Sequence, residues 1–445
     1  MDSPEQGDTI FALSSGRLPA GVAVIRVSGP CSVPVVTTLV GTLPEERQLA
    51  LRGIRSRSGQ LIDRGLVAVF RSPHSFTGED CVELHLHGGP AVVRALLEEL
   101  GSFSDVRHAE AGEFSLRAYR NGKFDLTTAE ALADLIQAET EAQRRFALEN
   151  SGGRNGSLYA GWREALLRAR SLIEAELDFP DEHDVPGSVS ADVWKDVAVL
   201  AREIDSHMQG YRRGEIIRDG YRVVIVGPPN AGKSSLLNAL ARRDVAIVSD
   251  EPGTTRDLVE VDLNLAGLKI IVTDTAGVRE GAGTIEKEGI ARARTAAAAA
   301  DLILLLEEGS GPVDLADFLP GPVPFLSVRS KVDLLHRGDS RETAPDVEVS
   351  AVTGIGLSTL LDMISARAEA AAGKITDTVP FRERHVMELR SAAAALLRFA
   401  GMQDEPLELA AEQLRVAALH LARIIGAIDV EDMLDVVFSR FCIGK

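Results

Sequence analysis

The sequence has few cysteines, no long apolar run and no excess of positive charge. Three widely spaced cysteines in 445 residues are typical of a reducing cytosol rather than of a disulfide framework. No run of about eighteen apolar residues exists, so no segment is predicted to span a membrane. The acidic start Met1–Glu5 lacks the pattern of a signal peptide. We therefore expect a cytoplasmic protein.

The net charge excludes one broad class of function. A formal net charge of −18 argues against a general nucleic-acid binder, so contact with RNA needs a local basic patch or a basic partner. Two groups of arginines are candidates for such a patch: Arg47, Arg52, Arg55, Arg57 and Arg64, and separately Arg212, Arg213 and Arg218. The alternative interpretation of each group is a solvated, charged loop.

One motif is specific for nucleotide binding. Residues Gly227-Pro-Pro-Asn-Ala-Gly-Lys-Ser234 fit the pattern G-x-x-x-x-G-K-[ST] of a phosphate-binding loop. The motif stands between a predicted strand, Tyr221–Val226, and a predicted helix, Ser235–Ala241. Its glycines let backbone N–H groups point at phosphate oxygens. We expect Lys233 to reach the outer phosphates and the Ser234 hydroxyl to hold Mg2+.

Two further motifs narrow the nucleotide to GTP. Asp274-Thr-Ala-Gly277 follows the predicted strand Leu268–Thr273, where the aspartate holds Mg2+ through water and the glycine N–H senses the γ-phosphate. Ser330-Lys-Val-Asp333 stands where GTPases usually carry Asn-Lys-x-Asp, and Ser350-Ala351 is similar to the usual Ser-Ala base contact. A carboxylate at Asp333 accepts two hydrogen bonds from guanine that adenine cannot donate. The order of the motifs predicts a Ras-like P-loop GTPase domain.

The chain is too long for one core, so about two to four domains are expected. Residues 1–119 contain strand-like runs such as Cys81–His87 and are predicted to form an α+β domain. Residues 120–218 and 373–445 are rich in Ala and Leu at helical spacing, and long helices are predicted over Thr127–Asn150 and Ser190–Ile217. Residues 219–372 form the predicted α/β nucleotide domain. The simplest topology is a helical domain with the GTPase domain inserted into it.

Several segments identify the chain as a member of a family. They are Thr77–Pro90, Asp178-Phe-Pro-Asp-Glu182, Gly253-Thr-Thr-Arg-Asp257 and the terminal Phe441-Cys-Ile-Gly-Lys445. With the helical domain and inserted GTPase, the whole chain resembles the MnmE (TrmE) family of tRNA-modification GTPases. The resemblance implies a homodimer formed through the N-terminal domain and a partnership with the flavoprotein MnmG. Together they would add an aminomethyl-type or carboxymethylaminomethyl group to the wobble uridine of tRNA, using a folate one-carbon unit.

The resemblance also implies how hydrolysis is catalysed. Val278 stands where Ras-type enzymes carry a water-orienting glutamine, and its side chain can neither donate nor accept. In the family a potassium ion offsets the developing charge, and Glu286 matches the water-orienting glutamate, with Glu288 as a nearby alternative. The implied potassium ligands are Asn230, Ser249, Glu251 and Thr254, and the implied magnesium ligands are Ser234 and Thr255. The expected catalytic residues are Lys233, Arg256, Glu286 and Cys442, the last of which is either a nucleophile or an inert terminal thiol.

The remaining expected contacts belong to the nucleotide and to a folate. The other nucleotide contacts are Ala231, Gly232, Ser235, Asp250, Pro252, Gly253, Thr275, Ala276, Gly277, Lys331 and Val332. The folate site implied by the resemblance, for 5-formyltetrahydrofolate or a related folate, consists of Arg26, Glu83, Lys123 and Lys445. Glu83 suits the paired N–H donors of a pterin, whereas Arg26 or Lys123 suits the carboxylate tail.

Two other functions compete with this interpretation. A ribosome-assembly GTPase of the Era or Der type would use the nucleotide as a timer, but that class normally adds an RNA-binding domain such as KH. Gly153-Arg-Asn-Gly156 matches the KH clamp pattern, yet the flanking helices indicate a helix–helix turn. The third candidate is an aminomethyltransferase-like folate protein with an incidental switch domain.

Overall fold

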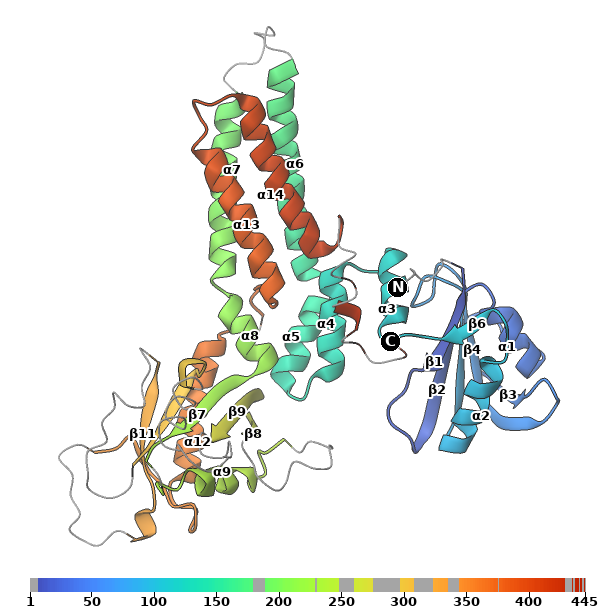
Figure 1. Ribbon diagram of the computed structural model, residues 1–445, viewed down its shortest axis with the longest axis horizontal. Coiled ribbons are helices and arrows are strands. Elements are labelled where there is room, and N and C mark those ends of the chain that lie inside the picture. The colour runs from blue at the N-terminus through green and yellow to red at the C-terminus, as the bar shows by residue number, and fades with distance from the viewer. Residues whose placement is uncertain are drawn as a thin grey trace, which may run out of the picture. The chain divides into compact units, whose positions relative to one another are not determined.

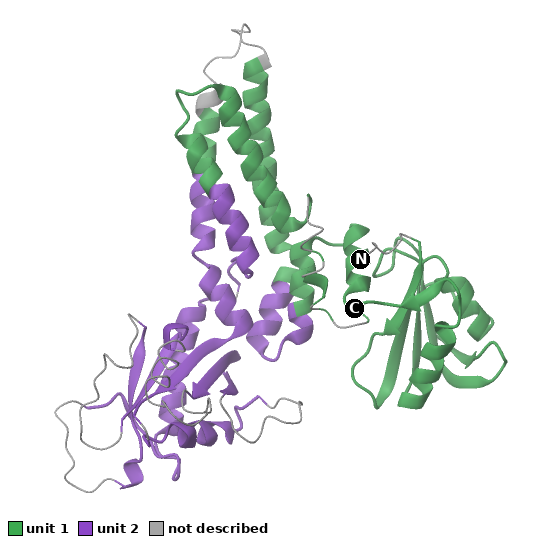
Figure 2. Cartoon of the chain, in the orientation of Figure 1, with its two compact units in different colours: residues 1–133, 150–198, 394–445 green, residues 134–149, 199–393 purple. Residues whose placement is uncertain are grey.

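The computed structural model describes residues 7–178, 189–228, 230–247, 260–274, 297–307, 323–334, 344–374, 376–428, 434, 437–439, 441 and 444. The chain forms two compact units (Figure 2). Unit 1 consists of residues 1–133, 150–198 and 394–445, and unit 2 of residues 134–149 and 199–393. The nucleotide-binding motifs all fall in the continuous stretch 199–393 of unit 2.

A six-stranded sheet forms the N-terminal part of unit 1 (Figure 1). Its order is β3-β4-β5-β2-β1-β6, and every neighbouring pair is antiparallel except β1 and β6. The strands are β1 (Thr9–Leu13), β2 (Ala20–Ser28), β3 (Ala50–Arg55), β4 (Leu61–Phe70), β5 (Cys81–Gly88) and β6 (Val106–His108). Along β5 the side chains alternate, so Leu84 faces the core while Glu83 and His85 lie on the opposite face.

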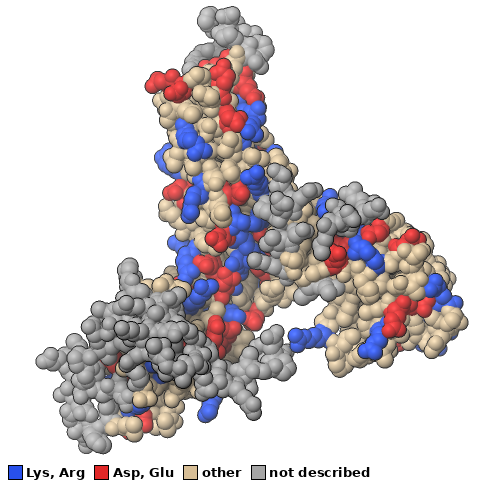
Figure 3. Space-filling view, in the orientation of Figure 1, with Lys and Arg blue, Asp and Glu red and all other residues tan. Residues whose placement is uncertain are grey.

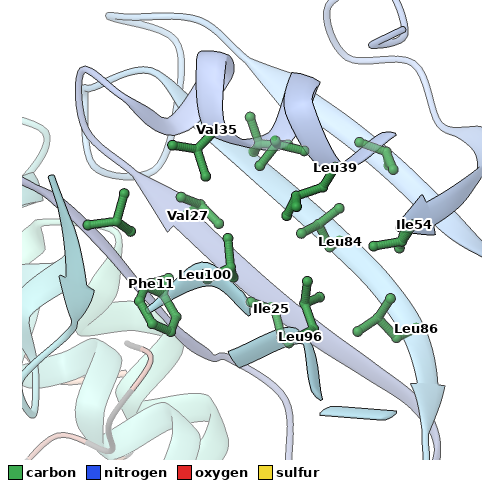
Figure 4. Packing of buried hydrophobic residues seen from close by; sticks show 14 of the residues in the cluster. Phe11, Ile25, Val27, Val35, Leu39, Ile54, Leu84, Leu86, Leu96 and Leu100 are labelled. Atoms are coloured by element: carbon green, nitrogen blue, oxygen red, sulfur yellow. The ribbon is translucent and has the colours of Figure 1, made fainter. Parts of the chain in front are cut away.

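Helices cover the two faces of this sheet unequally. Helices α1 (Ser32–Val40) and α2 (Pro90–Leu100) pack on one face, where Leu39 and Leu96 meet Leu84 in the buried cluster of Figure 4. Burial of each such side chain contributes roughly 1.5–3 kcal/mol. On the other face α3 (Glu113–Arg120) packs Phe114 against β1. Leu51 and Leu66, further along this second face, are 65% and 40% exposed.

Helices make up most of the rest of unit 1, and several continue into unit 2. They are α4 (Leu126–Gln137), α5 (Glu141–Ser151), α6 (Arg154–Asp178), α7 (Val189–Met208), α13 (Glu383–Ala400) and α14 (Leu407–Ile425), whereas α8 (Tyr211–Asp219) lies wholly in unit 2. Helix α6 packs along α14, and Trp194 of α7 stacks on Phe399 of α13 with ring centroids 4.4 Å apart. Acidic and basic side chains are intermixed over the visible face of these helices (Figure 3). No helix within the described ranges is long and apolar enough to cross a membrane.

Two long helices expected from the sequence are each divided in two. The helical pattern over Thr127–Asn150 is interrupted between α4 and α5, where the Gln143 side chain accepts hydrogen bonds from the backbone N–H groups of Glu139 and Thr140. The pattern over Ser190–Ile217 is interrupted at Gly210, between α7 and α8. A Cβ at Gly210 would lie 2.5 Å from Val379 Cγ1, so close packing requires glycine at this break.

The nucleotide motifs lie on a second six-stranded sheet, in unit 2. Its order is β12-β11-β10-β7-β9-β8, and all pairs are parallel except β8 with β9. The elements are β7 (Tyr221–Val226), α9 (Lys233–Ala241), β8 (Glu260–Leu265), β9 (Leu268–Asp274), β10 (Leu302–Glu307), β11 (Phe325–Arg329), the 3-10 turn η1 (Val332–Leu334), β12 (Val347–Glu348) and α12 (Leu357–Ala372). Because parallel strands end at one edge, the carboxyl ends of β7, β9 and β11 lie there together.

Candidate functional site

The phosphate loop joins the end of β7 to the start of α9. Gly227 has a φ of 151°, and a Cβ there would lie 2.4 Å from the Leu306 carbonyl oxygen, so only glycine fits. Asn230 and Gly232 also have positive φ angles, of 63° and 92°, in the turn before α9. Turns of this kind direct backbone N–H groups inward, and α9 adds the positive end of its dipole. The backbone geometry therefore fits phosphate oxygens.

Lys233 begins α9 and is almost fully buried. Its ammonium group donates to the carbonyl oxygens of Gly227 and Pro228, both at 2.9 Å. Burial lowers the pKa of Lys233, and the nearby Asp274 carboxylate opposes that effect. The lysine thus crosses over the phosphate loop, and its cation is available to phosphate oxygens in place of the two carbonyls.

Ser234 and Asp274 bring two oxygen donors together at the edge of the sheet. Asp274 is the last residue of β9 and pairs with Ile225 of β7, which places its carboxylate beside the phosphate loop. The Ser234 hydroxyl donates to Asp274 Oδ2 at 2.5 Å, and Asp274 is fully buried. A hydroxyl and a carboxylate are hard oxygen ligands of the kind that Mg2+ prefers. The residues present therefore fit the expected magnesium site.

Ser330 connects the predicted base-binding loop to the phosphate loop. It follows β11 and is almost fully buried. Its hydroxyl donates to the Ala231 carbonyl at 2.5 Å and lies 3.3 Å from the Glu307 carbonyl oxygen. The serine that replaces the usual asparagine therefore fixes two loops against each other.

Asp333 and Ser350 belong to two loops that contact each other through the backbone. The Val332 N–H donates to the Val349 carbonyl at 3.3 Å, and Thr353 N–H donates to the Ser350 hydroxyl at 3.1 Å. Asp333 itself is exposed in η1, with its carboxylate open to a ligand rather than enclosed. Lys331, Val332 and Ala351 complete this part of the predicted site, next to Ser330 and Ser350.

Several expected site residues lie outside the described residues. For the nucleotide, magnesium and potassium these are Ser249, Asp250, Glu251, Pro252, Gly253, Thr254, Thr255, Thr275, Ala276 and Gly277. The same holds for Arg256, Glu286 and Cys442 of the catalytic set and for Lys445 of the folate set. Of the expected potassium ligands, Asn230 is described, and it lies in the phosphate loop next to the fixed turn at Gly232.

The expected folate residues Arg26 and Glu83 are cross-strand neighbours on β2 and β5. Arg26 Nε and Nη2 both donate to Glu83 Oε1, at 3.1 and 2.9 Å, and the two side chains are 17% and 18% exposed. The Arg26 guanidinium also lies over the Phe76 ring, 4.9 Å from its centroid. This contact places the two charged groups at one point of the sheet face. The expectation that Arg26 or Lys123 binds the carboxylate tail while Glu83 binds the pterin stays a prediction, and the Arg26–Glu83 contact favours Lys123 for the tail.

Lys123 and the C-terminus approach the same region. The Lys123 ammonium donates to the Pro73 carbonyl at 2.7 Å, on the segment that also carries Phe76. Gly444 packs against β1 so closely that a Cβ there would lie 2.1 Å from the Leu13 carbonyl oxygen. Leu13 neighbours Ala12, which pairs with Arg26 across the sheet. Gly444 thus lies beside β1, the strand that pairs with Arg26 of β2.

The sequence prediction missed two functional candidates in this domain. His85 Nε2 lies 3.3 Å from Glu83 Oε2, so it holds the carboxylate oxygen that Arg26 leaves open. The period-two alternation of β5 places His85 on the face of Glu83 and is the signal that could have found it. Cys81 lies on this face too, but burial raises the pKa of its thiol to about 12, with Arg26 opposing. The Cys81 thiol is therefore not a nucleophile at neutral pH.

Comparisons with known proteins agree over nearly the whole chain. A family model described as the GTP-binding protein TrmE N-terminus matches residues 9–123, and one described as the MnmE helical domain matches residues 126–442. The second match encloses the nucleotide sheet, as an inserted domain requires, which confirms the expected fold class. A tRNA modification GTPase MnmE of Mesorhizobium japonicum is 56% identical over 99% of this chain and 99% of its own length.

Two further relatives give the same result. The proteins named tRNA modification GTPase MnmE in Rhizobium meliloti and Brucella canis are 55% and 54% identical to this chain. Each match covers 98% of this chain, and it covers 99% and 98% of the relatives' own lengths. Identity of this degree over full length, together with the two family models, settles the classification. The chain belongs to the MnmE (TrmE) family of tRNA-modification GTPases.

Proposed function

We propose that this protein is a potassium-dependent GTPase that works with the flavoprotein MnmG to modify the wobble uridine of tRNA in the cytoplasm. The modification is an aminomethyl-type or carboxymethylaminomethyl group, and its one-carbon unit comes from a folate. The observation that supports the GTPase part best is one junction at the edge of a parallel sheet. There the phosphate loop, the Ser234–Asp274 pair and the base loop are connected by hydrogen bonds.

Each part of this junction has a task in GTP hydrolysis. The backbone from Gly227 to Gly232 binds the phosphates, and Lys233 moves from its carbonyl partners to the outer phosphate oxygens. Ser234, and Asp274 through water, would hold Mg2+, and the ion would neutralise part of the phosphate charge. A K+ ion, when bound through the Asn230 amide oxygen, would supply the positive charge that other GTPases take from an arginine.

Arg26 and Glu83 form the pterin end of the proposed folate site. Their contact makes them a single donor and acceptor unit, and His85 orients the second carboxylate oxygen. Lys123 is then the cation left for the carboxylate tail, since its present partner is the neutral Pro73 carbonyl. Lys445 is the second candidate, because the adjacent Gly444 reaches β1.

A homodimer is supported by the second face of the N-terminal sheet. Leu51 pairs with Leu66, Leu66 with His85, and His85 with Val24, so these four residues form one row across four strands. Leu51 and Leu66 are exposed in this row. Such an apolar row on a sheet face fits a second copy of the same face.

The proposal is tested by the nucleosides of tRNA in cells that lack the gene. We expect the modified wobble nucleoside to disappear on deletion, to return with the wild-type gene and to stay absent with Lys233→Ala. Arg415→Gln is the matched control and should restore it, since Arg415 is an exposed residue of α14 paired with Glu412. A normal nucleoside profile in the deletion strain, measured by mass spectrometry, would contradict the proposal and favour a ribosome-assembly role.

A further inference from the structure

The proposed substrate and the protein are both strongly negative. A formal net charge of −18 repels the phosphate backbone of tRNA at long range. Binding of tRNA therefore requires a surface on which positive charge is concentrated and not already neutralised. The sequence contains two arginine groups that could form such a surface, one around residues 212–218 and one around residues 47–64.

The arginines around α8 already have carboxylate partners. Arg212 Nη1 lies 2.5 Å from Glu215 Oε2, and its Nη2 contacts the Asp301 carboxylate. Arg218 Nη2 lies 2.5 Å from Asp219 Oδ2, and Arg213 Nη1 lies 3.4 Å from Asp377 Oδ2. Because each positive charge has an acidic partner, this group leaves little net charge for RNA.

The arginines of the β3–β4 hairpin, with Arg47 just before β3, bond mainly to backbone carbonyl oxygens rather than to carboxylates. The stretch from Arg47 to residue 62 has four arginines and no acidic residue. Arg47 Nη2 donates to the His74 carbonyl at 2.9 Å, Arg52 Nε to the Thr42 carbonyl at 2.6 Å, and Arg55 Nη1 to the Gly59 carbonyl at 3.1 Å. Carbonyl oxygens fix the direction of a guanidinium but carry no formal charge. The positive charge of these three side chains therefore remains available.

The acidic residues around the hairpin do not change this result. Arg57, the fourth arginine, pairs with Glu99 at 3.2 Å and is not counted as available. Arg47 Nε lies 3.8 Å from Glu46, but both side chains are well exposed, so this pair is weak. The Asp63 carboxylate accepts hydrogen bonds from the His87 backbone and ring.

The position of the hairpin suits a large partner. Strand β3 lies at the edge of its sheet (Figure 1), and among the described strands it pairs with β4 alone. By alternation Arg52 lies on the helix-covered side of the sheet with Ile54, where its guanidinium reaches the Thr42 carbonyl after α1, whereas Arg55 is exposed on the side of Leu51. A guanidinium presents two parallel N–H donors to a phosphate, and a carbonyl partner can be kept while the remaining donors bind it.

We propose that the β3–β4 hairpin binds the phosphate backbone of tRNA through Arg47, Arg52 and Arg55. The inference rests on the proposed function for the identity of the substrate, but its location on the hairpin is independent of the GTPase mechanism. Contacts of this kind position the RNA and do not read its sequence. Recognition of the particular tRNA is thus a task for other surfaces or for the partner flavoprotein.

The test compares two triple variants of the full-length protein. The hairpin variant is Arg47→Gln, Arg52→Gln and Arg55→Gln. The control is Arg144→Gln, Arg168→Gln and Arg415→Gln, three exposed helical arginines that each pair with a glutamate. Both variants remove three positive charges, from the hairpin region in one and from glutamate-paired positions on helices in the other. Affinity for unmodified tRNA is measured by filter binding over a series of salt concentrations.

We expect the hairpin variant to bind tRNA about tenfold or more weakly than wild type. The slope of log K against log salt should shrink by roughly two to three, as the loss of three phosphate contacts requires. The control should stay within about twofold of wild type. Equal binding by wild type and the hairpin variant, or an equal loss in both variants, would overturn the inference.

A conservative variant separates charge from structure. Arg47→Lys, Arg52→Lys and Arg55→Lys keep the charges and should retain most of the salt slope, whereas a loss as large as that of the glutamine variant would overturn the inference. A wild-type protein that shows no salt-dependent binding of tRNA would defeat it as well. The nucleoside profile of the deletion strain tests the proposed function separately. If the deletion strain lacks the modified nucleoside but the hairpin variant binds tRNA as well as wild type does, the inference about the hairpin is wrong and the proposed function stands.

Discussion

Ser330 is the residue at which this chain departs most clearly from other GTPases. The sequence places it where asparagine is usual, and the structure gives it a task within the protein. Its hydroxyl connects the base loop to the Ala231 carbonyl, 99 residues earlier in the chain, so the two halves of the nucleotide site are held together. This short hydrogen bond at a buried position thus helps to fix the base loop against the phosphate loop.

We predict that Ser330→Ala weakens GTP binding about fivefold. Removal of the hydroxyl leaves the Ala231 carbonyl without this donor, which costs about 1 kcal/mol. Ser327→Ala is the control, because Ser327 lies on β11, just before Ser330, and its hydroxyl bonds to Asp346. Titration with a fluorescent GTP analogue measures both affinities. Unchanged binding by Ser330→Ala would show that the loops are held by other contacts.

We predict that Asp333→Asn reverses the preference for the base. The carboxylate accepts from the guanine N1–H and 2-amino groups, whereas an amide presents a donor that suits the xanthine carbonyl. Competition between GTP and xanthosine triphosphate is the measurement, and GTP should lose at least tenfold relative to its competitor. Because Asp333 is exposed in η1, the substitution leaves the core unchanged. A retained guanine preference would remove Asp333 from the base site.

The motifs were predictable at the residue scale because each is a contiguous pattern with one chemical purpose. As the patterns predict, Gly227 follows β7, Lys233 begins α9 and Asp274 ends β9. The Arg26–Glu83 ion pair was not predictable, because it depends on the register between β2 and β5. A strand pattern gives the face of a side chain but not its cross-strand neighbour.

At the scale of elements, apolar periodicity does not show where one helix ends and the next begins. The continuous apolar pattern from α7 to α8 predicted one helix, but Gly210 packs against Val379 and separates them. Near this break His207 is half-buried, and desolvation lowers its pKa to about 4, with a hydrogen bond to the Thr378 backbone opposing that shift. At neutral pH the His207 imidazole near the end of α7 is therefore uncharged.

We predict that this part of the protein loses stability in mild acid. The pKa of His207 falls from 6.5 when unfolded to about 4 when folded, so protonation favours the unfolded state. The contribution of neutral His207 to the free energy of unfolding is complete above pH 6.5. It is lost as pH falls toward 4, which lowers the free energy of unfolding by up to about 3 kcal/mol. Urea unfolding at pH 7 and pH 4.5 measures the difference. His207→Gln should reduce it, and the exposed His74→Gln should not; equal acid sensitivity in all three proteins would contradict the assignment.

At the scale of the whole molecule, the domain plan followed from helical periodicity and from the order of the nucleotide motifs. Helical patterns flank these motifs on both sides, and the helical-domain match over residues 126–442 confirms an insertion. The domain limits at residues 119, 218 and 372 stay predictions. The sequence offered the arginines between residues 47 and 64 as a candidate patch, but it could not show which of them have acidic partners, nor could it locate the exposed row, which depends on the register between strands.

We predict that the N-terminal sheet forms the dimer contact. Leu51→Glu with Leu66→Glu places charges in the exposed row and should convert a dimer to a monomer. Leu397→Glu with Leu409→Glu is the control, since these leucines are also exposed but lie on helices. Sedimentation gives the mass of each variant. A dimer that persists in the sheet variant would place the interface elsewhere.

The central claim is that a potassium ion held at Asn230 supplies the charge for hydrolysis. Its most direct test is the GTP turnover of the full-length protein in potassium and in sodium at equal ionic strength, for wild type and Asn230→Ala. The account predicts that wild type is at least about tenfold faster in potassium and that Asn230→Ala is equally slow in both salts. Equal wild-type rates in the two salts, or potassium stimulation retained by Asn230→Ala, would contradict it.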